Sequence, residues 1–140
     1  MAASPAVERI MKEYKGKVRL VMKFLPYKYR DFAFISAEAA LAAQDQGRFF
    51  EMHQLLLKRS PQLDRVSLVR YAQELGLDTV KFQQSLDTKM HAVHINRDLN
   101  LGTELDLYNT PSFFINGRRV VGNVPYEYLK KIVTEELKKQ

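Results

Sequence analysis

The residues that could carry chemistry begin with Asn109, Thr110 and Pro111, directly ahead of a short apolar run. An X-Pro bond is the only common place for a cis peptide. The apolar run at 113–115 leads into an Asn-Gly pair at 116–117, which suits a type I′ turn because both turn positions need positive φ. The stretch predicts a buried β-hairpin entered through a proline, with a cis bond or a trans-proline at a strand entrance as the alternatives.

Two histidines suggest a different chemistry. His91 and His94 fall with Asp87 and Asp98 on what reads as one polar helix, and their spacing could hold a zinc ion. The same spacing arises readily on any polar helix. We therefore expect no metal at these residues, and no other cofactor.

Two more titratable side chains have structural interpretations. His53 follows Met52 in a packed helix, so we expect it to be structural. Glu38 could tune a nearby thiol if it were buried, but we expect it on the solvent side of its helix. No Ser/His/Asp set, phosphate loop or paired-carboxylate signature stands out.

Composition excludes several classes. The 140 residues contain no cysteine, so the chain has no disulfide, no thiolate nucleophile and no Cys-containing metal site. Its net charge of +6 comes from scattered Lys and Arg residues, which favours a solvated basic surface over a nucleic-acid site. No run approaches the ~18 apolar residues of a membrane span. No signal peptide is visible, so the chain is either cytosolic or separated from its export signal.

The elements that would position these residues follow from periodicity. A helix at about 5–14 is followed by an alternating strand at 17–24. An Ala-rich helix at 32–46 and a second helix from 48 lead to two more, capped by Asp64 and Asp78. A less regular pattern continues to about 105. After the hairpin, Pro125 opens a final helix whose expected buried stripe is Tyr128, Leu129, Ile132, Val133 and Leu137.

One feature of this order is anomalous. The first helix and strand look like the second half of a right-handed βαβ unit, which needs a strand ahead of its helix. In this sequence Met1 stands where that helix should already be under way.

The chain resembles DsbA-like thioredoxin-fold proteins, which exchange disulfides and carry a helical insertion. The resemblance spans essentially the whole chain. Its segments are individually weak, but their order and spacing are specific: 17–21, the Ala-rich 37–43, 47–53, 71–78, Asp98 and above all 110–117.

The resemblance implies an α/β fold of the thioredoxin type with a multi-helix insertion. Residues 1–140 would form a single thioredoxin-like domain with the insertion at about 31–105. In the family, a Cys-x-x-Cys motif opens the first helix and is commonly followed four residues later by a proline. Residues 1–4 and Pro5 match that spacing, so we expect the two cysteines immediately before Met1 and the first core strand before them. The chain would then be N-terminally incomplete, through a misplaced start or a truncation.

The resemblance also assigns a function. A thiolate at a helix N-terminus has a lowered pKa and attacks a substrate disulfide. Pro111 matches the family's cis-proline, Thr110 the residue before it and Asn109 the approach to this loop, so these three are the expected substrate-binding residues. The chain as given, without cysteine, should have no redox activity. A non-catalytic module that binds peptides or partner proteins is the alternative.

The expected partners follow from the same resemblance. They are protein or peptide substrates with thiols or disulfides and a redox partner protein, without nucleic acid. The missing strand would lie between the strands at 17–24 and 113–116, and open edges of this kind favour homodimerisation or strand exchange. The family is mostly periplasmic or otherwise extracytoplasmic, with the cytoplasm as the alternative. Redox direction and substrate stay open.

Overall fold

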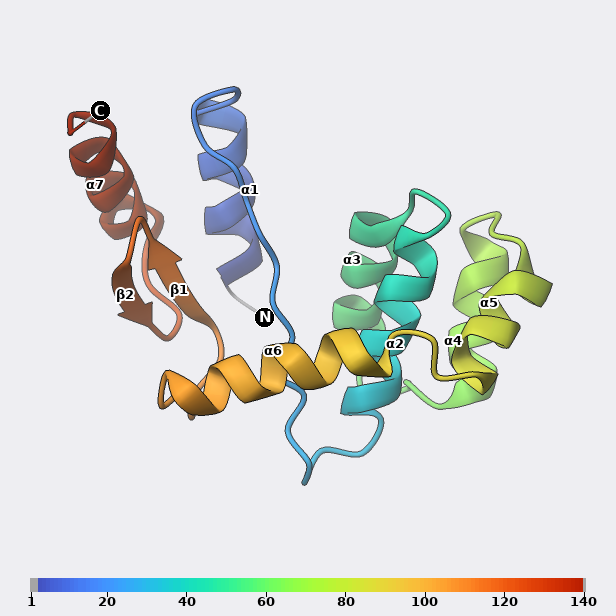
Figure 1. Ribbon diagram of the computed structural model, residues 1–140. Helices are drawn as coiled ribbons and strands as arrows, with labels where there is room; N and C mark the ends of the chain where they lie inside the picture. Colours follow the sequence, from blue (N-terminus) through green and yellow to red (C-terminus); the bar gives the residue numbers. More distant parts are fainter. Residues whose placement is uncertain (1–2, 140) are drawn as a thin grey trace. The chain divides into compact units, whose positions relative to one another are not determined.

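The computed structural model describes residues 3–139. Met1 and Ala2, which belong to the spacing match with Pro5, lie outside that range. The chain divides into two compact units. We call Met1–Lys23 with Leu105–Gln140 the hairpin unit, and Phe24–Glu104 the helical unit. Figure 1 labels the elements of both.

The hairpin unit joins two helices to a two-stranded sheet. Helices α1 (Ala3–Glu13) and α7 (Tyr126–Leu137) contact each other, and α7 also contacts strand β1 (Ser112–Ile115). Strand β2 (Arg118–Val121) pairs antiparallel with β1. Five residues of this unit form its buried core: Ile10, Val120, Leu129, Ile132 and Val133.

The hairpin turn has the predicted geometry. Asn116 has φ 47° and Gly117 has φ 86°, and both belong to the left-handed region. A type I′ turn requires positive φ at both central positions, and its twist matches that of the flanking strands. The register pairs Phe113 with Val120 and Ile115 with Arg118. The sequence prediction of a hairpin at this place is therefore confirmed.

The prediction of a β-strand at 17–24 is wrong. Within residues 3–139 the sheet contains β1 and β2, and the 17–24 segment runs beside no ladder partner. Its alternation survives, because Val18, Leu20 and Met22 are half-buried while the odd-numbered residues from 17 to 23 are exposed. Apolar alternation places side chains on one face, but a strand also needs a second backbone to pair with.

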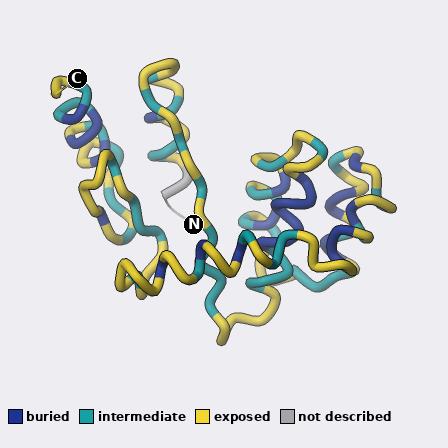
Figure 2. Tube along the Cα trace, in the orientation of Figure 1, coloured by how far each residue is buried: buried dark blue, intermediate teal, exposed yellow. Residues whose placement is uncertain are grey.

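The helical unit is built around α2 (Ala33–Gln44). Helices α3 (Phe49–Arg59), α4 (Arg65–Glu74), α5 (Thr79–Asp87) and α6 (Ala92–Glu104) all contact it. The small side chains of α2 allow this close approach, and four of its alanines are 0–2% exposed: Ala39, Ala40, Ala42 and Ala43. Figure 2 shows the buried stretch along α2. The central helix is thus covered on several faces.

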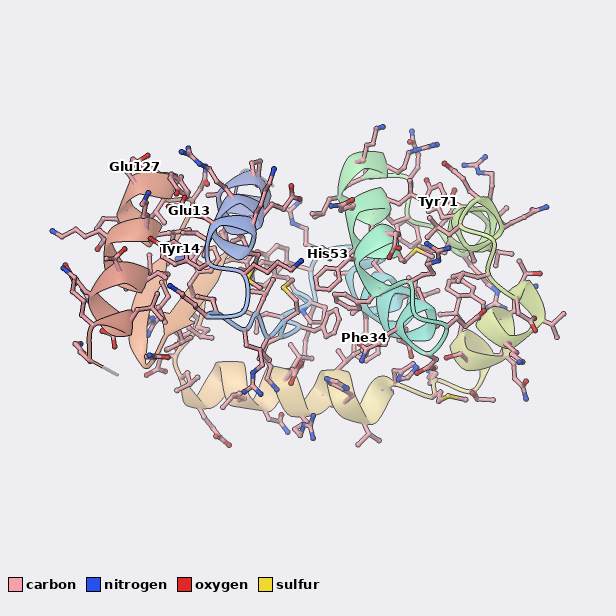
Figure 3. All side chains as sticks on the ribbon, turned by 90° about the horizontal axis from the view of Figure 1, so that it is seen from above. Glu13, Tyr14, Phe34, His53, Tyr71 and Glu127 are labelled. Atoms are coloured by element: carbon pink, nitrogen blue, oxygen red, sulfur yellow. The ribbon has the colours of Figure 1, made fainter. Side chains whose placement is uncertain are left out.

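Large side chains from the surrounding helices complete this core. Met52, Leu68 and Phe82 are fully buried, and so is Tyr71, whose hydroxyl donates to the Gln62 carbonyl at 2.8 Å. Tyr71 on α4 is labelled in Figure 3. The predicted caps form as well, since the Asp64 carboxylate accepts from Ser67 N and the Asp78 carboxylate accepts from two backbone N–H groups.

Two side-chain placements differ from expectation. Glu38 is 6% exposed instead of facing solvent, because α2 is covered on faces that its sequence alone does not mark as internal. Tyr128 is 50% exposed, although its neighbours Leu129, Ile132 and Val133 are buried as predicted. The buried face of α7 therefore contains fewer residues than the apolar pattern of its sequence predicted.

Candidate functional site

The loop ahead of β1 is fixed by short backbone contacts. The Thr110–Pro111 peptide bond is cis. The Ser112 hydroxyl donates to the Asn109 carbonyl at 2.6 Å, and Gly122 N donates to the Pro111 carbonyl at 2.8 Å. Thr110 is exposed while Pro111 is half-buried. These hydrogen bonds connect the loop to the first residue of β1 and to the residue that follows β2.

Arg119 holds the other end of the same loop. Its guanidinium donates to the Leu105 carbonyl at 3.1 Å and to the Asp106 carbonyl at 3.0 Å. The Tyr108 hydroxyl donates to the Asp106 carboxylate at 3.2 Å. Sequence reasoning missed Arg119, because a contact between residues 13 and 14 positions apart leaves no local pattern. Its role is visible only once the hairpin has turned β2 back towards the loop.

Within residues 3–139, strand β1 pairs with β2 along one edge and with no strand along the other. Pro111 and Gly122 form a hydrogen-bonded pair, and ladder bonds alternate along an antiparallel strand. The N–H and C=O groups of Ser112 and Phe114 therefore point away from β2. The Phe114 side chain is 44% exposed. An extended peptide can add to an open edge of this kind through main-chain hydrogen bonds.

Ion pairs tie the hairpin to α7. Arg118 Nη1 lies 2.5 Å from Glu135 Oε2 and 3.5 Å from Glu136 Oε1. The hydrogen bond from Arg118 lowers the pKa of Glu135. The pKa of Glu136 is also lowered, first by its hydrogen bond from Lys139 and then by Arg118. The carboxylates stay ionised at neutral pH and keep β2 attached to the helix.

A second polar contact joins α1 to α7. Glu13 accepts a hydrogen bond from Tyr126 and lies 2.6 Å from Lys130 Nζ. The bonds that Lys130 makes to Glu13 and Tyr126 raise its pKa to about 12. At the end of α1, the Tyr14 hydroxyl lies 2.9 Å from Thr134 Oγ1. Figure 3 labels Glu13 and Tyr14. Together with the apolar core, these contacts set how the two helices support the hairpin.

The four residues considered as a zinc site do not form one cluster, and the expectation that they share one helix is wrong, because Asp87 ends α5 whereas His94 and Asp98 belong to α6. His91 Nε2 lies 2.7 Å from Asp45, and His94 Nε2 lies 3.5 Å from Asp98. Asp87 pairs with Arg65 at 2.7 Å. Among the described residues no group of three or more His, Asp or Glu side chains could hold a metal ion.

Asp98 and His53 each contact neighbouring residues of the helical unit. The Asp98 carboxylate, 3% exposed, accepts from Phe24 N at 3.1 Å and so joins the start of the helical unit to α6. The His53 ring stacks on Phe49 with ring centres 5.8 Å apart. Burial lowers the pKa of His53, which favours the neutral ring.

The fold can now be compared with known proteins. A family model described as Thioredoxin matches residues 2–135. The chain belongs to the thioredoxin family. A thioredoxin-like oxidoreductase from Silicibacter pomeroyi superposes with a TM-score of 0.85 at 29% identity, over 97% of this chain and 78% of that one. The thiol-disulfide exchange protein α-DsbA2 from Wolbachia pipientis gives a TM-score of 0.84 at 22% identity, over 96% of this chain and 73% of that one, and shows that this thioredoxin-family fold is of the DsbA type.

Some curated proteins that match this thioredoxin-family chain are named for another activity, Na⁺/H⁺ antiport. Na⁺/H⁺ antiporter NhaA 1 of Salinispora arenicola is 38% identical over 133 residues, which are 94% of this chain and 20% of that protein. NhaA 3 of Salinispora tropica is 39% identical over 132 residues, with the same coverage. The chain thus spans about a fifth of the length of these relatives. Antiport is the named activity of those longer proteins.

No helix between residues 3 and 139 is both long enough and apolar enough to cross a membrane.

Proposed function

We propose that this chain is the substrate-binding part of a thiol:disulfide oxidoreductase that acts on protein or peptide substrates. The observation that carries the proposal is the Asn109–Thr110–Pro111 loop, held by contacts on both sides and leading into a strand with an open edge. This loop lies in a DsbA-type fold within the thioredoxin family. The role of these three residues is to bind the backbone of an extended substrate.

The redox step needs two thiols that the 140 residues do not contain. By the family's spacing, we propose a Cys-x-x-Cys immediately before Met1. One thiolate attacks a substrate disulfide, a mixed disulfide forms and one substrate thiolate leaves. The second thiolate then resolves the mixed disulfide, so the substrate is reduced while the pair is oxidised. The reverse sequence oxidises a substrate dithiol. The loop holds the substrate sulfur close to the pair in either direction.

The test compares the chain alone with a form extended at its N-terminus. The extension is a designed β-strand followed by a Cys-x-x-Cys motif, placed at the family's spacing ahead of Met1. We expect no insulin reduction above buffer for the chain alone and clear turnover for the extended form. A Cys-x-x-Cys to Ser-x-x-Ser version of the extension is the control. Redox turnover by the Cys-free chain, or none by an extended form that folds, would contradict the proposal.

A second candidate function is a non-catalytic module that binds peptides or partner proteins through the same loop. The absence of cysteine from all 140 residues favours it. Binding of unfolded peptides by the chain, combined with an extended form that folds but turns nothing over, would support this function. A redox-active extended form would support the first.

We also propose that the open edge of β1 pairs with a second copy of the chain when nothing else occupies it. Exposed strand edges act as templates for pairing. Sedimentation measurements should then show a dimer whose fraction rises with concentration. A monomer at all accessible concentrations would contradict this pairing.

A further inference from the structure

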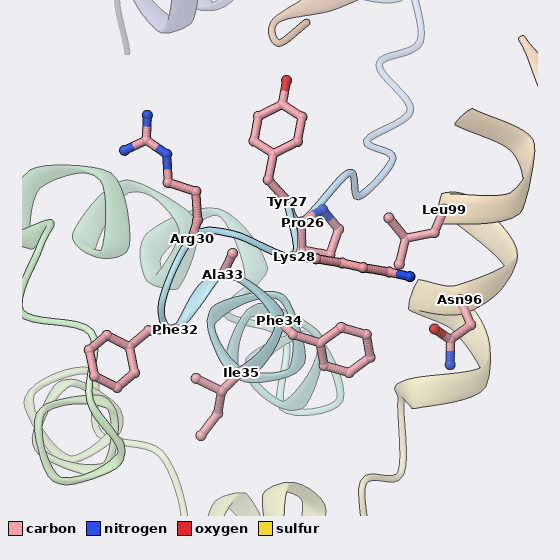
Figure 4. A pocket seen from close by; sticks show the side chains of 10 residues that line it. All are labelled: Pro26, Tyr27, Lys28, Arg30, Phe32, Ala33, Phe34, Ile35, Asn96 and Leu99. Atoms are coloured by element: carbon pink, nitrogen blue, oxygen red, sulfur yellow. The ribbon is translucent and has the colours of Figure 1, made fainter. Parts of the chain in front are cut away.

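The helical unit contains a shallow pocket of about 410 Å³. It is formed by the loop at 26–32, the first turn of α2 and the middle of α6, and Figure 4 shows it from close by. Its apolar lining includes Phe34, Ile35 and Leu99. A concave apolar surface with a few polar groups at its margin is the usual form of a ligand site.

Two cations line the same pocket. Lys28 and Arg30 are exposed, and neither side chain has a hydrogen-bond or ion-pair partner among residues 3–139. Figure 4 shows the Lys28 side chain directed towards Leu99 and Asn96 of α6. Asp31 is in the same loop but does not line the pocket.

Lys28 and Arg30 are the basic residues that line the pocket, and some of the other basic residues of the unit are paired with carboxylates. Three arginines have a carboxylate within ion-pair distance: Arg48 with Glu51, Arg59 with Glu74 and Arg65 with Asp87. The helical unit as a whole carries ten basic and ten acidic residues. The lining of the pocket contains these two unpaired cations and no acidic residue, so the pocket is complementary to an anionic ligand.

The loop also displays aromatic side chains. Tyr27 and Tyr29 stack with ring centres 5.2 Å apart, and Tyr29 is 76% exposed. Phe32 is 46% exposed and has φ 63°, an uncommon conformation for a bulky residue. Phe32 lines the pocket, so an apolar ring is partly exposed at this site.

We propose that this pocket binds an extended peptide segment in which an acidic residue stands next to a large apolar side chain. The apolar lining takes the apolar side chain, and Lys28 and Arg30 hold the neighbouring carboxylate. Two cations around an apolar floor fit such a peptide better than a nucleic acid, which needs a longer row of phosphate contacts. The proposal does not depend on the proposed redox function, because every lining residue lies in the helical unit and the cis-proline loop lies in the hairpin unit.

The first experiment titrates the full isotope-labelled chain with a capped octapeptide of alternating glutamate and leucine. Its matched control is the same peptide with glutamine in place of glutamate. We expect saturable shifts of the backbone amides in residues 27–35 and 96–99 with the acidic peptide, and much weaker shifts with the neutral one. Equal shifts with both peptides, or shifts confined to other residues, would overturn the proposal.

The second experiment removes the cations. Lys28→Gln combined with Arg30→Gln should weaken binding of the acidic peptide about tenfold at low salt, since each exposed charge pair contributes modestly. Lys58→Gln combined with Arg70→Gln makes the same change of charge elsewhere on the helical unit, and should change affinity less than twofold. An equal loss in both double variants would show attraction to general charge and would overturn the site.

A third variant separates binding from folding. Phe32→Asn removes the exposed ring and places a residue that tolerates left-handed φ at the start of α2. We expect weaker peptide binding together with unchanged or increased thermal stability. Unchanged affinity would remove Phe32 from the site. Amide shifts in 27–35 that grow with protein concentration in the absence of peptide would instead identify a second copy as the occupant, which would overturn the peptide.

Discussion

The hairpin unit and the helical unit differ in their net charge, in the size of their buried cores and in their unpaired backbone edges. All of the net charge of +6 lies in the hairpin unit, with twelve basic and six acidic residues, whereas the helical unit is balanced. Among the residues whose burial is described, twelve form the main core of the helical unit and five the core of the hairpin unit. As far as the structure describes the chain, the hairpin unit also contains the open edge of β1 and residues 17–23 of the segment that forms no ladder.

The difference shows how stability and binding are divided within this chain. Between its ends a helix satisfies its own backbone groups, and caps such as Asp64 and Asp78 satisfy groups at the ends, so side-chain packing completes the helical unit. A two-stranded sheet leaves backbone groups on its outer edges and is marginal by itself. The unit that bears the candidate substrate loop is therefore the less complete one, and substitutions in the two units should respond differently.

The largest expected effect comes from core truncation. Leu68 is 0% exposed within the larger core, and Leu129 is 3% exposed within the smaller one. Leu68→Ala should cost about 4 kcal/mol of unfolding free energy and Leu129→Ala about 2 kcal/mol, because a site in the smaller core can relax more fully. Urea unfolding of both variants measures this. A larger loss for Leu129→Ala would reverse the comparison.

The next effect concerns two turns that need left-handed backbone. Gly117 in the hairpin has φ 86°, and Gly76 after α4 has φ 70°. Alanine at either position should cost about 1–2 kcal/mol. Amide hydrogen exchange should show faster exchange of β1 and β2 in Gly117→Ala, and of α4 and α5 in Gly76→Ala. If Gly117→Ala accelerated exchange in both units equally, the two would not behave as separate units.

A smaller effect follows from the buried carboxylate of α2. Burial raises the pKa of Glu38 above 4.5, against the attraction of Lys89 and His91, and its Oε1 has no hydrogen-bond partner among the described residues. An acid whose folded pKa is raised contributes stability below 4.5 that is lost as pH rises through the folded pKa. Glu38→Gln should therefore stabilise the chain by about 1 kcal/mol at pH 7 and by little at pH 4.

The control for this substitution is Glu51→Gln on α3. The pKa of Glu51 is lowered, first by a hydrogen bond to its own backbone and then by Arg48. Removing its charge should not increase stability at pH 7. A gain in both variants at pH 7 would mean that a general reduction of negative charge, and not the burial of Glu38, is the cause.

The smallest effect is the acid response of the hairpin unit. Glu13, Glu135 and Glu136 all have a lowered pKa because Lys130, Arg118 and Lys139 are the first hydrogen-bonding partners of the three carboxylates respectively. Such acids contribute stability above 4.5 that is lost as pH falls through the folded pKa. Hydrogen exchange of α1 and α7 should therefore become less protected as pH falls from about 5 towards 3, after correction for the intrinsic rates.

The helical unit is the internal control for the acid response. It contains Glu38, whose pKa is raised, and also Glu51 and Asp64, whose pKa values are lowered. Opposite signs within one unit should partly cancel. Protection of α2 and α5 should then change less over the same range. A flat profile for α1 and α7 would contradict the electrostatic part of the comparison.

Local chemistry in the sequence determined the hairpin and the helix ends. Asn116 and Gly117 specify their turn because few residues accept positive φ, and Asp64 and Asp78 cap helices because their carboxylates reach the next backbone N–H groups. The absence of cysteine is by itself enough to predict that this chain has no redox turnover, because no other side chain replaces a redox thiol. The order of the family's segments predicted the DsbA-type fold.

Tertiary structure alone decided what depends on distant neighbours. The burial of Glu38, the contact of Arg119 with the loop and the pairing of His91 with Asp45 all depend on residues far apart in sequence. The 17–24 segment alternates between exposed and half-buried residues as a strand does, but it forms no hydrogen-bonded ladder. A ladder needs a second backbone, and the residue pattern of one segment does not show whether that backbone is present. A residue pattern predicts which faces are apolar, but the packed fold determines which groups those faces meet.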